Sequence, residues 1–235
     1  MIRKFFETEG AKLRKMNFRD KRQYIWEYYK LHIILTCIVI FVIGYMINHL
    51  VINPPIRSYI YISWQADFVH TDTLDALGVA LNPIVENYER YEVHVRSYVL
   101  TGDPQMDQAL ITRFQALIHV GDLHAIVILG EHDVIANAQV GLIMPVDGMM
   151  EELYMLNPAL HDYIQTRVLP ITFTDLNERE QTEMMAVSLQ DAPLFAELGI
   201  NSDELYLSVV VTGDANYKLA KALEIIFEGT LVYGE

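Results

Sequence analysis

A run of 22 residues without a charged side chain, from Leu31 to Ile52, constrains this chain more than any other feature of its sequence. As a helix it would extend about 33 Å, enough to cross a hydrocarbon core of roughly 30 Å. Core helices of soluble proteins seldom run so far without a charge. The distinctly polar residues, His32, Thr36, Asn48 and His49, lie mainly towards the two ends, where a spanning helix meets the head groups. Residues 31–52 are therefore predicted to form a single transmembrane helix.

The charges on the two sides of this run differ in sign. Residues 1–30 hold nine basic and four acidic side chains, a net charge of +5. Residues 53–235 hold eight basic and 27 acidic side chains, a net charge of −19. Because the cytoplasmic flanks of spanning helices carry the excess of lysine and arginine, we expect a single-pass protein of the cell membrane. Its basic N-terminal arm would be cytoplasmic, and the part after residue 52 would be extracellular.

The run is too long for the 7–15 apolar residues of a signal peptide, and no small-residue cleavage pattern follows it, so we expect an uncleaved signal anchor. Tyr24, Trp26, Tyr28 and Tyr29 precede it, beside basic residues that suit anionic head groups. Membrane lipid is the expected partner of this arm, with a dedicated cytoplasmic partner as the alternative. The sole cysteine, Cys37, lies inside the run, so no intrachain disulfide is expected.

After a short, proline-stiffened linker at residues 53–56, residues 57–235 are long enough for one domain with its own core. Their apolar pattern alternates between the strand and helix periods. It predicts strands at 58–64, 91–99, 125–130 and near 169–174, 184–189 and 204–212. It also predicts helices at 73–88, 103–121 and between Asp214 and Gly229, and a helical stretch near 149–166. Pro83 should kink or divide the first of these helices, whereas Asp103-Pro104 should start the second and Gly121 should end it. This alternation predicts an α/β fold with a mixed, partly parallel sheet flanked by helices.

The stretch HVGDLHAIVILGEHD (119–133) raises the question of a metal site, because histidines and carboxylates surround its apolar centre. A central strand of six residues would hold the two polar ends roughly 20 Å apart, so one ion cannot be bound by both. Two smaller groups remain, 119–124 and 131–133, and a similar group lies at 67–72. Turn formation and helix capping explain each of them at least as well, so no metal is expected.

Known catalytic motifs are absent from the sequence: there is no Gly-x-Ser-x-Gly, no phosphate-binding glycine-rich loop and no His-Glu-x-x-His. The paired carboxylates Glu151/Glu152 and Glu178/Glu180 are typical of solvated surfaces. The sequence therefore predicts a non-catalytic protein without a cofactor.

The segment QALIHVGDLHAIVILGEHDVIANAQVGLIMPVD (115–147) resembles the extracellular solute-binding proteins of bacterial ABC importers, of the type 2 periplasmic-binding class. The resemblance consists of Gly121-Asp122, the apolar strand 125–129 and the Gly-x-x-x-Pro-x-Asp pattern of 141–147. The first strand and the last helix, NYKLAKALEIIFEG, are also similar. The chain departs from that class in being about half as long and in lacking a lipidated cysteine. The resemblance therefore implies a related fold with a shortened second lobe.

Open α/β sheets bind ligands beyond the carboxyl ends of their strands. This rule selects a set of candidate ligand-binding residues that follow the first three predicted strands: Trp64, Gln65, Asp67, Thr101, Glu131 and His132. Trp64 could stack on a sugar or a cation, with Gln65 and Asp67 as polar partners; the alternative is a tryptophan packed at a strand end. The acidic surface disfavours nucleic acid and favours a neutral or cationic small solute.

We therefore expect a membrane-anchored, solute-binding-like domain that acts as a binding or interaction module. The alternative is a scaffold or accessory subunit that contacts a membrane-protein partner and has a vestigial cleft, which a large exposed apolar patch would favour. A metal-dependent surface hydrolase is a third, weaker interpretation.

Overall fold

The computed structural model describes residues 16–53, 56–67, 69–86, 90–100, 102–174, 179–211 and 215–228. The chain divides into two compact units, Met1–Pro55 and Ile56–Glu235.

The first unit contains helix α2 (Phe18–Ile47), which continues into a π-helical turn, Asn48–Ile52. The whole segment Phe18–Ile52 reaches a mean hydropathy of 2.3 in its most apolar part and is long and apolar enough to cross a membrane. Helix α2 starts well before the uncharged run at Leu31, so the described part of the basic, aromatic arm is helical as well.

The second unit is built on one mixed sheet. Its strands are β1 (Arg57–Trp64), β2 (Tyr91–Ser97), β3 (Ala125–Leu129), β4 (Ile143–Met144), β5 (Val168–Thr174), β6 (Glu180–Ser188) and β7 (Leu205–Val210). Their order is β2-β1-β3-β7-β6-β5, and β4 pairs with β7. Strands β2, β1 and β3 are parallel, whereas β7 is antiparallel to β3, to β6 and to β4. The predicted α/β fold with a mixed, partly parallel sheet is confirmed.

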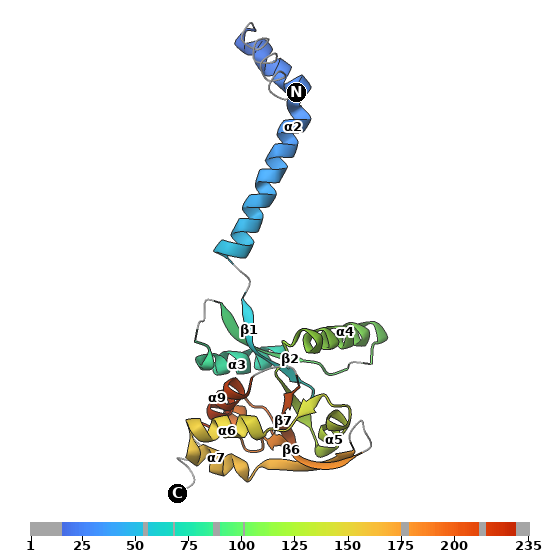
Figure 1. Ribbon diagram of the computed structural model, residues 1–235, viewed down its shortest axis with the longest axis vertical. Coiled ribbons are helices and arrows are strands. Elements are labelled where there is room, and N and C mark those ends of the chain that lie inside the picture. The colour runs from blue at the N-terminus through green and yellow to red at the C-terminus, as the bar shows by residue number, and fades with distance from the viewer. Residues whose placement is uncertain are drawn as a thin grey trace. The chain divides into compact units, whose positions relative to one another are not determined.

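Helices cover both faces of the sheet. They are α3 (Thr71–Leu81), α4 (Pro104–Val120), α5 (Glu131–Gln139), α6 (Asp147–Leu156), α7 (Pro158–Gln165), α8 (Pro193–Glu197) and α9 (Asn216–Ile226). Helices α3, α6, α7, α8 and α9 pack in one apolar layer, with β1 residues such as Ile62 and Trp64. Helices α4 and α5 pack in the other layer, with Tyr61 and Ile126. Figure 1 shows α3 and α4 on opposite sides of β1 and β2.

The predicted helix signals operate as expected in α3 and α4. The carboxylate of Asp103 accepts hydrogen bonds from the backbone N–H groups of Gln105 and Met106, and Pro104 occupies the first turn of α4. Gly121 ends α4 in the left-handed conformation, with φ 76°. Helix α3 ends at Leu81, and Pro83 lies in the short 3-10 turn that follows, as its fixed φ requires.

The predicted helical stretch near 149–166 is confirmed and consists of two helices, α6 and α7. Asn157 separates α6 from α7, because its side chain accepts a hydrogen bond from the backbone N–H of Leu160 and thus caps a second helix that starts at Pro158. The short elements β4 and α8 were not predicted from the sequence. Asp214 and Gly229, the expected limits of the last helix, lie outside the described residues.

Candidate functional site

The topology gives the carboxyl ends of β1 and β3 a special place in the sheet. Strand β1 leads into α3 on one face, whereas β3, its neighbour, leads into α5 on the other face. The chain therefore leaves the carboxyl ends of two adjacent parallel strands in opposite directions. Such a topological switch point is where open α/β sheets form their binding crevice.

A pocket of about 350 Å³ occupies this place, which we call the strand-end pocket. Its apolar walls include Leu129 at the end of β3, Leu205 at the start of β7, and Ile200. Leu129 and Leu205 are paired in the antiparallel ladder, so the amino end of β7 lies beside the carboxyl ends of the parallel strands. Polar side chains reach the pocket from the loop after β1, from α3 and from the loop before β7.

Trp64 forms part of the wall of this pocket rather than a free aromatic face. Its side chain is only 1% exposed and lies against Phe195, with the two ring centroids 6.0 Å apart. The indole Nε1 donates a hydrogen bond of 3.0 Å to the backbone carbonyl of Asp67. The buried ring therefore fixes the start of the loop that carries Asp67 and His70.

The polar lining consists of Asp67, His70, Thr73, Asn201 and Asp203. Two of these side chains are carboxylates, and no lysine or arginine is among the described residues that line the pocket. The Asn201 side-chain oxygen accepts a hydrogen bond of 3.2 Å from the backbone N–H of Asp203, which fixes the loop in front of β7. Carboxylates beside an amide and a hydroxyl can bind the ammonium or hydroxyl groups of a neutral or cationic solute.

The structure brings two of the six predicted ligand residues, Trp64 and Asp67, into the strand-end pocket. Gln65 lines a different hollow on the other face of the sheet. Glu131 and His132 are exposed in the first turn of α5 and do not line the pocket. Thr101 lies outside the described residues.

Sequence reasoning missed the contribution of residues 199–203. Asn201 and Asp203 lie more than sixty residues after β3, and nothing in their local pattern marks them as neighbours of Trp64. Only the antiparallel pairing of β7 with β3 brings them to this edge.

The histidines of the stretch 119–133 are separated by β3, as its length predicted. His124 lies just before β3, where its Nδ1 accepts a hydrogen bond of 3.1 Å from the backbone N–H of Tyr61. The backbone N–H of His124 donates a hydrogen bond of 3.0 Å to the carbonyl of Tyr61, so His124 adds to the hydrogen bonding between β1 and β3. Burial, together with the nearby Lys218 cation, lowers the pKa of His124. Among the described residues, no three His, Cys, Asp or Glu side chains converge on a point that could hold a metal ion.

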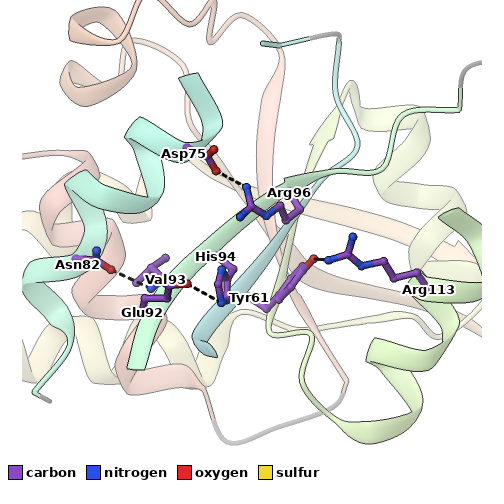
Figure 2. A network of polar contacts seen from close by, with 8 residues as sticks. All are labelled: Tyr61, Asp75, Asn82, Glu92, Val93, His94, Arg96 and Arg113. Atoms are coloured by element: carbon purple, nitrogen blue, oxygen red, sulfur yellow. Dashed lines mark hydrogen bonds and ion pairs between the residues drawn. The ribbon is translucent and has the colours of Figure 1, made fainter. Parts of the chain in front are cut away.

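A polar network fastens the edge strand β2 to its surroundings (Figure 2). On β2, Arg96 forms an ion pair with Asp75 of α3, and His94 lies 3.3 Å from the Glu92 carboxylate. Arg113 of α4 donates to the Tyr61 hydroxyl on β1 at 3.4 Å. Burial, which outweighs the Glu92 carboxylate, lowers the pKa of His94. These contacts join β2 to α3 and, separately, α4 to β1.

A second hollow of about 680 Å³ lies between α4 and the body of the domain, and we call it the α4 groove. Its lining comes from α4, from Tyr98 to Leu100 after β2, from the turn after α5, and from Gln65. The groove is mostly apolar, in contrast to the strand-end pocket.

Comparisons of the chain with protein-family models, with curated proteins and with solved structures found no match.

Proposed function

We propose that this chain is a single-pass membrane protein whose outer, non-catalytic domain binds a neutral or cationic small solute in the strand-end pocket. We further propose that this domain is a shortened relative of bacterial solute-binding proteins. The observation that carries the proposal is the position of the pocket at the topological switch point between β1 and β3. Its volume of about 350 Å³ is within the range of small-molecule sites.

The electrostatics of the pocket support the choice of solute. Asp67 and Asp203 place negative charge at its mouth, and residues 53–235 as a whole carry a net charge of −19. An anionic ligand would be repelled by this field, whereas a cation would be concentrated near it. The polar groups of Thr73 and Asn201 add hydrogen bonding for hydroxyl-rich or amide-bearing solutes.

The proposed orientation follows from the helix and its flanks. Helix α2 and the π-helical turn after it are long and apolar enough to cross a membrane. The net charge of +5 in residues 1–30 supports a cytoplasmic N-terminus, with anionic lipid as the partner of the arm. The outer domain would then face the extracellular side, where free solutes are available.

The test uses the purified full-length chain in detergent micelles. The chain has two tryptophans, so a Trp26→Phe variant leaves Trp64 as the only tryptophan to report on the pocket by fluorescence. The thermal midpoint and the Trp64 emission are measured against amines, polyamines, amino acids, peptides, sugars and divalent metals, with a chelator control. At 100 times its dissociation constant, a bound solute should add about 2.7 kcal/mol to the unfolding free energy.

Matched variants assign any response to the pocket. Asp67→Asn and Asp203→Asn should weaken the binding of a cationic solute. Asp133 is an exposed carboxylate in the first turn of α5, and Asp133→Asn should leave that binding unchanged. Trp64→Ala is unsuitable because the buried ring supports the fold. A panel without any response would count against solute binding, and a response to metals alone would revive the histidine and carboxylate groups.

A second function, that of an accessory subunit in a membrane complex, is favoured by one observation. The α4 groove exposes apolar side chains on the surface of the domain, which is typical of a protein contact. In that case the strand-end pocket is vestigial, and solutes leave the thermal midpoint unchanged while a protein partner raises it.

A further inference from the structure

Helix α4 carries an apolar stripe but has no buried residue. Leu110, Phe114, Leu117 and Ile118 are only partly covered by the apolar layer beneath them. The helix is held on one side by Arg113, whose guanidinium contacts the Tyr61 hydroxyl (Figure 2). The apolar side of α4 that faces the turn after α5 lines the α4 groove. This helix therefore keeps apolar surface that the rest of its own domain does not cover.

Among the described residues that line the α4 groove, none is charged. This is unusual for a domain segment in which 27 acidic side chains outnumber eight basic ones. Two copies of the domain, each with a net charge of −19, repel each other wherever carboxylates would meet. The described lining of the α4 groove contributes no carboxylate to a contact between two copies.

The same face offers both a hollow and the side chains to fill one. Leu100 is 58% exposed, Val140 is 64% exposed and Ile111 is 38% exposed, and all three line the groove. A small solute in so open a groove would leave this apolar rim in water, whereas ligand sites usually bury most of their ligand. A two-fold contact needs one patch that is complementary to itself, and a groove with protruding apolar residues on its own rim meets that need.

From these observations we infer that the α4 groove is the contact surface between two copies of this chain, which form a two-fold dimer through their outer domains. The inference does not depend on solute binding, because the groove and the strand-end pocket share no lining residue among those described. The proposed membrane anchor favours the contact further, since it would confine both copies to a plane.

The test is the oligomeric state of the purified full-length chain, measured by sedimentation in detergent micelles and by cross-linking in phospholipid vesicles. For cross-linking, Cys37→Ser removes the sole cysteine, and Gln115→Cys places a new one in the groove. Val79→Cys, at a 67% exposed position on α3, is the matched control. A short bismaleimide should join two copies through position 115 and not through position 79.

Variants then show which surface makes the contact. Leu100→Glu with Val140→Glu should weaken the dimer about tenfold or more, because four new carboxylates would meet across the two-fold axis. Gln115→Glu is a milder version at an exposed polar position, for use if the double variant does not fold. Val79→Glu should have no effect, and in the Trp26→Phe background Trp64 emission reports that each variant is folded.

Three results would overturn the inference. The first is a chain that is monomeric in micelles and does not cross-link in vesicles. The second is a dimer that survives the groove variants, which would place the contact elsewhere, for instance in the spanning helix. The third is a groove that cross-links only to a different protein in cells, which would make that protein its occupant.

Discussion

Replacement of Ser208 by alanine should stabilise the outer domain. Ser208 on β7 and Ser63 on β1 lie on either side of Ile126 in the sheet, since both are register partners of that residue. Both serine side chains are 0% exposed, and neither hydroxyl has a hydrogen-bond partner in the structure. These two hydroxyls thus lose their water on folding and gain nothing in return.

The size of the effect follows from the cost of such a group. A buried polar group without a partner costs about 1–3 kcal/mol, and alanine removes it at the price of a small void. We expect Ser208→Ala to raise the free energy of unfolding by about 1 kcal/mol. For a domain of this size, that corresponds to about 2–4 °C in the thermal midpoint.

The assay is thermal unfolding of the full-length chain in the Trp26→Phe background, followed by the emission of Trp64, which is only 1% exposed in the folded domain. Ser202→Ala is the control of opposite sign, because the Ser202 hydroxyl accepts a hydrogen bond of 3.1 Å from the backbone N–H of Asp191. Ser202→Ala should lower the midpoint. If Ser208→Ala lowers it as well, the Ser208 hydroxyl is bonded in solution, for instance to a buried water, and the reasoning is refuted.

Two further predictions concern packing and pH. Gly78→Ala should destabilise the domain by about 1–3 kcal/mol, because the added Cβ would lie 2.9 Å from the backbone oxygen of Val93. This loss is expected although alanine favours helices more than glycine does. Val79→Ala, at the exposed neighbouring position, should have little effect on the thermal midpoint. Burial lowers the pKa of His124 below its ordinary value of 6.5, so the unfolded chain binds the proton more readily, and stability should fall as the pH drops below about 6.5. His124→Asn, whose side-chain oxygen can still accept from Tyr61, should reduce this loss in unfolding measured from pH 7.5 to pH 5; an unchanged slope would assign the acid sensitivity to other groups.

Local signals in the sequence predicted correctly the helix ends that neighbouring residues determine. Asp103-Pro104 and Gly121 set the limits of α4, since a cap, a proline and a left-handed glycine act through neighbouring backbone groups. Asn157-Pro158 carries the same kind of start signal and divides the predicted helical stretch near 149–166 into α6 and α7.

The composition of the candidate site was less predictable, because it depends on which strands become neighbours. The antiparallel insertion of β7 beside β3 brings Asn201 and Asp203 to the carboxyl end of β1. No pattern within residues 199–205 encodes that pairing. Sheet order is decided by how the apolar faces of all the strands and helices pack together, and this information is spread over the whole domain.

The period of two residues in a strand explains why the predicted ligand residues did not gather in one place. Trp64 and Gln65 are adjacent in the sequence, yet their side chains point to opposite faces of the sheet and line different hollows. The carboxyl ends of these strands, with connections leaving on both faces, thus border two separate hollows, a polar one at the switch point and an apolar one under α4. Because Gln65 lines the groove, Gln65→Ala should leave the proposed solute binding at Asp67 unchanged, whereas Asp67→Asn should leave the proposed dimer unchanged. Loss of both activities in either variant would mean that the two hollows act as one site.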